Sequence, residues 1–309
     1  ADSTGNVFIA DWGNRRVRRV APDGLITTYA GTGDDGFTGD GGPATQALLN
    51  EPYGLAVDED GTLYIADRIN RVVRKVEGRT GVITTFAGNG GKVFSGDGGP
   101  AAKAGLVEPN GLALDRAGRR LFIADVADHR VRVVDLTTGV IRTFAGDGQG
   151  RHAGDGGPAL KASIFGARAV KVAGDGAVLI LERQGNSLRK VEPATGVIRT
   201  IAGTGQKGFT GDGGPANQAT FNGPKELAVS SAGDIAIVDT ENHAIRLIDA
   251  RTGRIRTVAG DGKVGGSGDG GPATAARLDR PHGVAFAPDG GIVIGDTNNH
   301  RVRKVSPPR

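Results

Sequence analysis

Short apolar segments bounded by Gly or Asp follow one another along the whole chain. The clearest run comprises residues Pro52–Val57, Leu63–Asp67, Arg71–Val76 and Gly81–Ala87. Each segment is rich in β-branched residues, which is the pattern of a strand that lies between turns. We therefore expect four consecutive strands here, and we name them strands a, b, c and d.

The four-strand unit repeats with a period of about 57 residues. A connection with the sequence Gly-Asp-Gly-Gly-Pro-Ala follows strand d, and its aspartate recurs at Asp40, Asp97, Asp155, Asp212 and Asp269. The acidic residue that ends strand b recurs in the same period, at Asp11, Asp67, Asp125, Glu182, Asp239 and Asp296. Six copies of such a unit predict an all-β six-bladed β-propeller with four-stranded antiparallel blades, in a single domain over residues 1–309.

Both ends of the chain fall inside the repeat. Ala1 aligns with Val57, so the first unit lacks strand a, and Arg309 falls just beyond strand c, so the last unit lacks strand d. We therefore expect incomplete terminal blades. Because an open strand edge invites pairing with other chains, we also expect some compensation at those edges.

Composition narrows the class of protein. The 54 glycines disfavour long helices and favour tight turns between short strands. No apolar run approaches the length of a transmembrane helix, and the chain does not open with a signal peptide. Cysteine is absent, which excludes disulfides, thiolate chemistry and Cys-ligated metals. The net charge of +4 is spread over the length, whereas a nucleic-acid binder concentrates basic residues on one face, so we do not expect a nucleic-acid partner.

The repeat resembles the NHL repeat family. Its pattern is Pro-x-Gly-(Leu/Val)-Ala-Val-Asp followed by Ile-Ala-Asp-x-x-Asn-His-Arg-Val-Arg-Lys-Val, and residues Asp296–Val305 are the closest copy. The Gly-rich connections look like those of bacterial NHL propellers. The resemblance covers essentially the whole chain and implies the six-bladed fold. It leaves function open, because the family includes protein-binding, RNA-binding, sensor and enzymatic members.

Features that recur in every unit are expected to be structural. A carboxylate ends strand b and an arginine follows seven residues later in strand c, which predicts ion pairs across the turn or between blades. In the connections, glycines favour turns, and Pro43 is expected to open a helical turn from Ala44 to Leu49 that packs Leu48 and Leu49 on the blade. His129, His243 and His300 share one position after strand b, and we predict no zinc there. We expect no cofactor, and weak calcium at a loop or channel carbonyl is left open.

Departures from the repeat point to a ligand site. The residue after Pro at the start of strand a differs in every unit and should face the channel mouth, and blades four and five depart most from the pattern. Polar and charged groups that converge in a concave site are typical of ligand binding. The candidate ligand-binding residues are Tyr53, Asn110, Arg168, Glu182, Lys225, Glu226 and His282. Arg168 and Lys225 would take an anion, and Glu182 and Glu226 would orient these cations.

Three functions fit this sequence. The first is a non-catalytic binding or scaffold module that recognises a protein or a small anionic ligand on the top face around the channel, in an extracytoplasmic or secreted location. The second is an enzyme that resembles the six-bladed lyases and lactonases. His282 is the only histidine at the Pro-x-Gly position that would ligate zinc in such a lyase, and Asn110 and Glu226 are too few for a lactonase-type calcium site. The third is RNA binding, for which Trp12 and Tyr53 are the only aromatic platforms.

Overall fold

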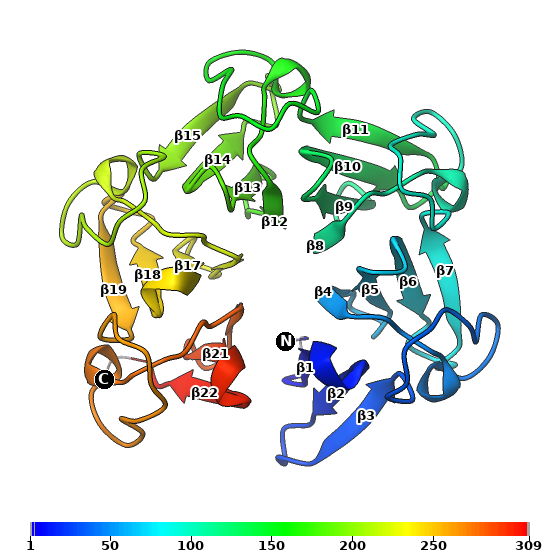
Figure 1. Ribbon diagram of the computed structural model, residues 1–309, viewed down its shortest axis with the longest axis horizontal. Helices are drawn as coiled ribbons and strands as arrows, with labels where there is room; N and C mark the ends of the chain where they lie inside the picture. The colour runs from blue at the N-terminus through cyan, green and yellow to red at the C-terminus, as the bar shows by residue number, and fades with distance from the viewer. Residues whose placement is uncertain (1, 3, 308–309) are drawn as a thin grey trace. The chain divides into compact units, whose positions relative to one another are not determined.

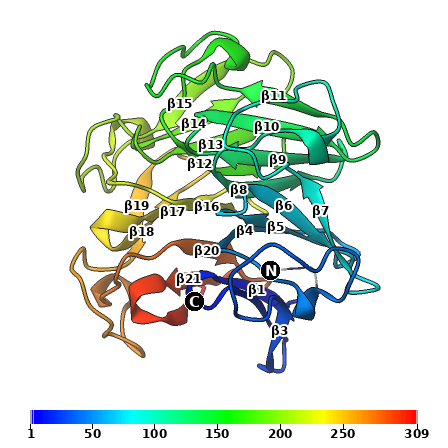
Figure 2. The same ribbon diagram turned by 45° about the vertical axis from the view of Figure 1, so that its right-hand side comes forward.

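The computed structural model describes residue 2 and residues 4–307, and these residues form short antiparallel strands that are grouped in six sheets (Figure 1). The strands of each sheet lie side by side in chain order (Figure 2). The fold class is the predicted all-β six-bladed propeller. We number the sheets as blades 1 to 6 in chain order. The chain divides into two compact units, Ala1–Gly148 and Gln149–Arg309, with three blades each, and the prediction of a single domain stays a prediction.

The first unit contains blades 1 to 3. Their strands are β1 (Val7–Asp11), β2 (Arg16–Val20) and β3 (Ile26–Ala30); β4 (Pro52–Val57), β5 (Leu63–Asp67), β6 (Val72–Val76) and β7 (Ile83–Ala87); and β8 (Pro109–Asp115), β9 (Arg120–Asp125), β10 (Arg130–Asp135) and β11 (Ile141–Ala145). Blade 1 lacks strand a, as predicted. Strands c and d of blade 2 begin later than predicted, because Arg71 and Gly81 have positive φ (56° and 68°) and belong to turns.

The second unit contains blades 4 to 6. Their strands are β12 (Ala167–Val172), β13 (Val178–Glu182), β14 (Ser187–Val191) and β15 (Ile198–Ala202); β16 (Glu226–Val229), β17 (Ile235–Asp239), β18 (Ala244–Ile248) and β19 (Ile255–Ala259); and β20 (Gly283–Phe286), β21 (Ile292–Asp296) and β22 (Arg301–Val305). Blade 6 has three strands and ends at β22, which confirms the missing strand d.

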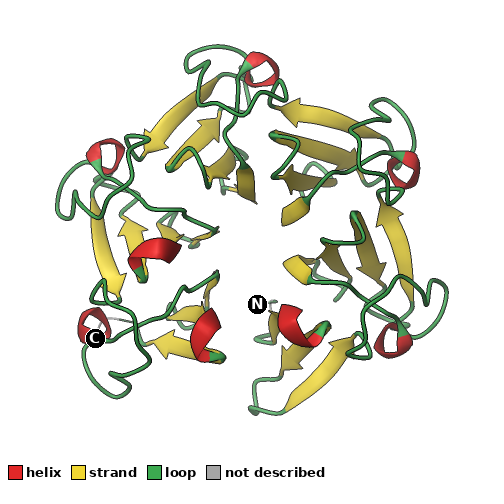
Figure 3. Ribbon diagram, in the orientation of Figure 1, coloured by secondary structure: helices red, strands yellow, loops and turns green. Residues whose placement is uncertain are grey.

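Helix is confined, over the described ranges, to three-residue 3₁₀ turns in connections (Figure 3). Five lie in the Gly-rich connections and three directly follow strand b: η2 (Ala44–Gln46), η3 (Ala101–Lys103), η4 (Ala159–Lys161), η5 (Ala216–Gln218) and η7 (Ala273–Ala275); η1 (Trp12–Asn14), η6 (Thr240–Asn242) and η8 (Thr297–Asn299). The predicted turn from Ala44 to Leu49 was too long, because Ala47 is extended and Leu48 forms a β-bridge with Thr38. Pro43 precedes this turn and is not its first residue. Leu49 is buried as predicted, whereas Leu48 is only partly buried.

The apolar core of each unit lies between successive blades. In the first unit, Val17 and Ala30 of blade 1 pack with Leu63 and Ile65 of blade 2. In the second, Leu181 of blade 4 packs with the buried apolar side chains of blade 5. This is how propeller blades bury their two faces, and it explains why both faces of strand b are apolar in most units.

The Gly-rich connections cover the outer edge of the following blade. Gly41 N–H donates to Ile83 O (2.8 Å), Ile83 N–H donates to Gly42 O (3.0 Å), and Ala44 N–H donates to Gly81 O (2.9 Å). The same three bonds recur in blades 3, 4 and 5. Blade 6 has no strand d to cover, and its last strand carries Arg301, Arg303 and Lys304, charges that discourage edge-to-edge pairing. Strand c of the complete blade 2 carries the equivalent Arg74 and Lys75, so the predicted compensation at the incomplete blades stays a prediction.

Candidate functional site at the start of strand a

The carboxylate–arginine pairs form a structural frame. Arg74 is fully buried, lies 3.6 Å from Asp67 of its own blade, and pairs at 2.7 Å with Asp40 of the preceding connection. It also donates to Thr38 O and Leu48 O, so it anchors the connection to the blade. Equivalent pairs with the connection are Arg132–Asp97, Arg189–Asp155, Arg246–Asp212 and Arg303–Asp269. The predicted pairing of the strand-b carboxylate with the strand-c arginine is confirmed in blades 2, 4, 5 and 6, with the connection aspartate as an additional partner of the arginine.

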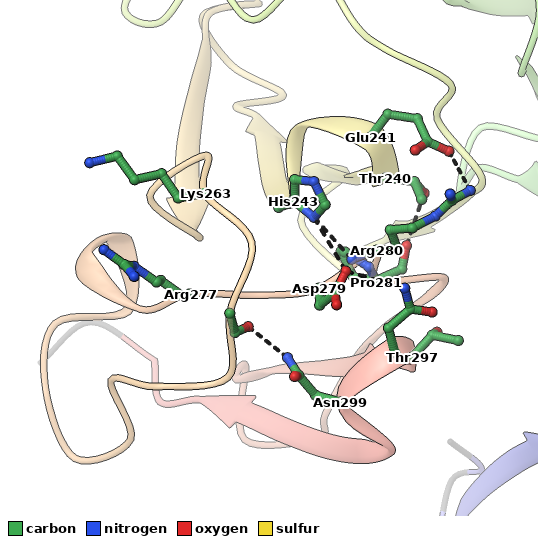
Figure 4. Close-up of polar contacts among 12 residues, drawn as sticks. Thr240, Glu241, His243, Lys263, Arg277, Asp279, Arg280, Pro281, Thr297 and Asn299 are labelled. Atoms are coloured by element: carbon green, nitrogen blue, oxygen red, sulfur yellow. Dashed lines mark hydrogen bonds and ion pairs between the residues drawn. The ribbon is translucent and has the colours of Figure 1, made fainter.

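The residue directly before strand c, at the end of the turn from strand b, has a left-handed conformation in all six blades. Its φ lies between 45° and 56° at Arg15, Arg71, His129, Asn186, His243 and His300. His and Asn are among the residues that adopt this conformation most readily, which accounts for the recurring histidines. His243 Nδ1 accepts a bond from Arg280 N–H (3.1 Å), and Thr240 donates to Pro281 O, so this turn links blades 5 and 6 (Figure 4).

Strand a starts irregularly in blades 2, 3 and 4. In β12 the pairing with β13 skips Arg168, and in β4 and β8 it skips the Tyr53–Gly54 and Asn110–Gly111 pairs. Such irregularities re-aim a side chain away from the regular pleat. Gly54 is required here, because a Cβ on it would lie 1.9 Å from Asn110 O. The position that varies most between units is therefore one where the backbone presents a side chain outside the blade.

A cationic cluster forms at this position in the second unit. Lys225 Nζ lies 2.6 Å from His282 Nε2, across blades 5 and 6. Arg168 of blade 4 acts electrostatically on both groups. Lys225 and Arg168 are almost fully buried (7% and 6% exposed), and His282 is partly buried. The structure thus brings together three of the seven predicted residues.

Burial and mutual repulsion shift both titrating groups of this cluster. The pKa of Lys225 is lowered to about 7, first by burial and then by the charges of Arg168, Arg183 and Arg280, against a smaller opposite effect of Glu241. Burial also lowers the pKa of His282 to about 3, with Lys225 and Arg168 as the next causes. At neutral pH the imidazole is uncharged and accepts the bond that Lys225 donates.

Tyr53 and Asn110 lie in the first unit, in a setting of mixed charge. Tyr53 lies under the guanidinium of Arg68, 5.9 Å from the ring centroid, and Arg68 pairs with Glu108 (2.9 Å) and with Glu51. Asn110 is buried and donates to Glu108 O (3.0 Å). Their role in ligand binding stays a prediction.

Glu182 and Glu226 have ionic partners outside the cluster, and their predicted role in orienting its cations stays a prediction. Glu226 pairs with Lys171 (3.1 Å). Successive residues of an extended chain point to opposite sides, so Glu226 faces away from the neighbouring Lys225. Glu182 is fully buried and contacts Arg189 of its own blade and His152 of the preceding connection.

Three charged residues around the cluster were outside the predicted set. Arg183, Arg280 and Glu241 all act on Lys225, and Arg280 donates to Glu241 (2.7 Å). Arg183 follows the unusual Glu182, and Arg280 follows Asp279 two residues before His282, so each lies next to a recognisable departure from the repeat. An alignment of the six units over the turn after strand b shows Arg183 and Glu241, and an alignment of the residues before strand a shows Arg280.

The described part of the chain contains neither a group of metal-ligating side chains nor a helix that could span a membrane. Across residue 2 and residues 4–307, no three His, Asp or Glu side chains are grouped as metal ligands would be. The prediction of no resident metal, with weak calcium left open, stays a prediction. None of the helices among these residues is long and apolar enough to cross a membrane.

Family models match two parts of the chain: the teneurin NHL domain matches residues 26–95, and the NHL repeat matches residues 278–305. Among known proteins, SUPPRESSOR OF QUENCHING 1 of Arabidopsis thaliana is 28% identical over 91% of this chain and 27% of its own length. Teneurin-4 of Mus musculus is 28% identical over 79% of this chain and 10% of its own length. The chain thus spans about a quarter or less of these relatives.

Three solved structures share the fold at low sequence identity. An auxiliary nutrient binding protein of Bacteroides thetaiotaomicron has a TM-score of 0.69 at 16% identity and covers 97% of this chain and 65% of its own. A chain of the nidogen/laminin complex has a TM-score of 0.62 at 13% identity, with 98% and 93% covered. Virginiamycin B lyase of Staphylococcus aureus has a TM-score of 0.55 at 13% identity, with 99% and 78% covered. The chain thus carries an NHL-type repeat, which its family model matches at residues 278–305, and it has a six-bladed propeller fold.

Proposed function

We propose that this protein is a binding module that takes a small anionic ligand at Arg168, Lys225 and His282. The observation that carries the proposal is the Lys225 ammonium, buried 2.6 Å from an imidazole and within the field of three arginines. Gathering buried positive charge is costly, and the lowered pKa of Lys225 reports that cost. A bound carboxylate or phosphate would relieve it.

The three side chains offer complementary contacts. Arg168 supplies a planar fork that matches a carboxylate or phosphate, and Lys225 supplies a compact charge. His282, uncharged at neutral pH, accepts from Lys225 through Nε2 and holds the ammonium in place. Arg183 and Arg280 add positive potential, and Glu241 is already engaged by Arg280.

The names of similar proteins support binding as the general role. One structural neighbour is called a nutrient binding protein, and another was solved in a nidogen/laminin complex. A protein partner with acidic side chains would use the same chemistry as a free anion. The extracytoplasmic location is part of the proposal and rests on the sequence alone.

The pKa of Lys225 makes binding depend on pH. An anion favours the charged ammonium, so binding raises the pKa of Lys225 above about 7 and takes up a proton at higher pH. Affinity should therefore be highest below pH 7 and fall above it, by at most about tenfold per pH unit. Calorimetry in two buffers of different ionisation enthalpy would detect the proton uptake at pH 8.

The test uses citrate, galacturonate and inorganic phosphate as probes in titration calorimetry with the full chain. Replacing Arg168 by Ala should weaken binding of the best probe by about 1.5–3 kcal/mol, the value of a hydrogen bond to a charged group. Lys225→Met should weaken it and remove the dependence on pH. Lys171→Ala is the matched control, since it removes one positive charge from the same strand outside the cluster. If Arg168→Ala and Lys171→Ala bind equally well, the cluster is not the site.

A further inference from the structure

Blade 4 departs from the other blades at a second place, in the connection before it. The residue three positions before the connection aspartate is Phe37, Phe94 and Phe209 in blades 2, 3 and 5, and it is His152 in blade 4. Each phenylalanine stacks on the buried strand-c arginine, at 4.6–5.2 Å from ring centroid to guanidinium carbon. His152 replaces this apolar contact with an imidazole whose side chain is 32% exposed.

His152 lies between a carboxylate and a hydroxyl. Its Nδ1 is 2.6 Å from Glu182 Oε2, and its Nε2 is 3.1 Å from Thr200 Oγ1. With the proton on Nδ1, the ring donates to Glu182 and accepts from the Thr200 hydroxyl when that hydroxyl does not donate to Asp155, its other side-chain partner. Both distances fall within the hydrogen-bond reach expected of a nucleophile, a base and the group that orients the base.

The carboxylate of this arrangement is held firmly. Glu182 is fully buried, and its Oε1 accepts from Arg189 Nη1 (2.9 Å). Its Oε2 also accepts from the Ser187 hydroxyl (3.2 Å), which lies 3.2 Å from His152 Nδ1. Ser187 is fully buried, so it supports the His–Glu pair and is not accessible as a nucleophile.

The residues by which blade 4 departs from the repeat are in contact with one another. Where blades 1, 2, 5 and 6 have Asp followed three residues later by Asn, as at Asp239 and Asn242, blade 4 has Glu182 and Gly185. A Cβ at Gly185 would lie 2.1 Å from Glu182 Oε2, so the longer carboxylate requires this glycine. Glu182, Gly185, Ser187 and His152 thus form one polar network, which independent drift at single positions does not readily produce.

Blade 5 has Phe209 and Asp239 at the positions of His152 and Glu182. Thr257 corresponds to Thr200, but Phe209 stands where blade 4 has His152, so no imidazole faces this hydroxyl. A pocket of about 480 Å³ opens there between the connection and the blade, lined by Phe209, Arg246 and Thr257 among others. The fold therefore allows a hollow beside this threonine.

We propose that Thr200, His152 and Glu182 form a nucleophilic site that cleaves small carboxylic esters. Thr200 is the nucleophile, His152 is the general base, and Glu182 holds the imidazole in the required tautomer and stabilises its charged form. The site is separate from the cationic cluster and does not depend on the anion-binding proposal.

The reaction balances with water as the only co-reactant. Thr200 Oγ1 forms a bond to the ester carbonyl carbon while its proton moves to His152 Nε2. The carbon–oxygen bond of the ester breaks, and the alcohol leaves with the proton from Nε2. Water then attacks the acyl-threonine, gives a proton to Nε2, and releases the carboxylic acid as Thr200 regains its proton.

The first experiment is covalent labelling of the full chain with an alkyl fluorophosphonate, followed by peptide mass spectrometry. Attack by Thr200 breaks the phosphorus–fluorine bond, so the expected product is a phosphonylated Thr200 with release of fluoride. His152→Phe should slow labelling at least tenfold, since general-base assistance contributes about 10²–10⁴ in rate. This variant restores the residue of blades 2, 3 and 5, so we expect it to fold, and thermal unfolding checks that.

Two further variants keep the test decisive if His152→Phe does not fold. Thr200→Val should abolish the label, and Thr257→Val, the matched change in blade 5, should leave it unchanged. Hydrolysis of p-nitrophenyl acetate should follow the same order. Labelling of the parent that misses Thr200, or that proceeds equally fast in folded His152→Phe, would overturn the proposal.

Discussion

Blades 4 and 5 share a buried strand-c arginine with its ion pairs, and they differ in the side chains around that arginine. In each, a fully buried arginine of strand c, Arg189 or Arg246, ties the preceding connection to the blade. Blade 5 completes the frame with Asp239 and a phenylalanine stacked on the arginine, whereas blade 4 has Glu182 and His152. The repeated residues therefore stabilise the fold, and a few changes at neighbouring positions of one blade bring a histidine and a glutamate together on it.

The largest expected effect comes from breaking the shared frame. Arg246→Met leaves the buried Asp239 and the connection Asp212 without their cation, and loss of one partner of a buried pair costs about 3–5 kcal/mol. Burial already raises the pKa of Asp239 to about 6, so the residual carboxyl should take up a proton. Urea unfolding measures the free energy of unfolding.

The control for that change is Arg256→Met, which removes an exposed arginine from strand d of the same blade. It should alter stability by about 0.5 kcal/mol or less. Equal effects of the two substitutions would show that the buried pairs do not hold the frame.

The next effect tests whether the departures of blade 4 are matched. Gly185→Ala should destabilise the protein by about 1–3 kcal/mol, because the new Cβ would lie 2.1 Å from Glu182 Oε2. In a Glu182→Asp background, the shorter side chain frees this space and most of the cost should vanish. A double-mutant cycle from urea unfolding measures this coupling.

Gly174→Ala is the control in the same blade, since nothing lies within 4 Å of a Cβ there. It should be close to neutral. Additive effects of Gly185→Ala and Glu182→Asp would contradict the idea that these two positions changed together.

A smaller effect concerns the cationic cluster that blade 4 shares with blades 5 and 6. The pKa of Lys225 is about 7 in the folded protein and 10.5 when unperturbed, so between these values the unfolded chain binds more protons. The free energy of unfolding should therefore rise with pH in this window, by at most about 1.4 kcal/mol per pH unit. Lys225→Met should remove this contribution. The measurement is the difference in unfolding free energy between parent and variant at pH 7.5, 8.5 and 9.5. A difference that does not change with pH would show that the pKa of Lys225 is not lowered in the folded protein.

The comparison also explains what the sequence alone could predict. Residues that recur in register, such as Asp239 and Arg246, predicted the strands, the incomplete end blades and the structural ion pairs. They could do so because a residue that every blade needs for folding is repeated in the sequence. Broken symmetry located Arg168, Lys225 and His282, which the structure brings together. The sequence did not predict the partners of single side chains, such as the ion pair of Glu226 with Lys171. His152 escaped notice because it lies in a connection and its partner Thr200 is a residue that every strand d shares.

The smallest effect concerns the left-handed turn after strand b, where blade 4 has Asn186 and blade 5 has His243. The two side chains accept equivalent hydrogen bonds from a backbone N–H before the next blade. Asn186 Oδ1 accepts from Gly223 N–H (2.9 Å), and His243 Nδ1 accepts from Arg280 N–H (3.1 Å). Both residues tolerate a φ near 50°, so His243→Asn should change the unfolding free energy by about 0.5 kcal/mol or less. His243→Val should cost about 1–3 kcal/mol, because a β-branched residue is strained at this φ and cannot accept the bond. If urea unfolding shows the asparagine variant to be as unstable as the valine variant, the histidine has a role that its backbone conformation and this single bond do not explain.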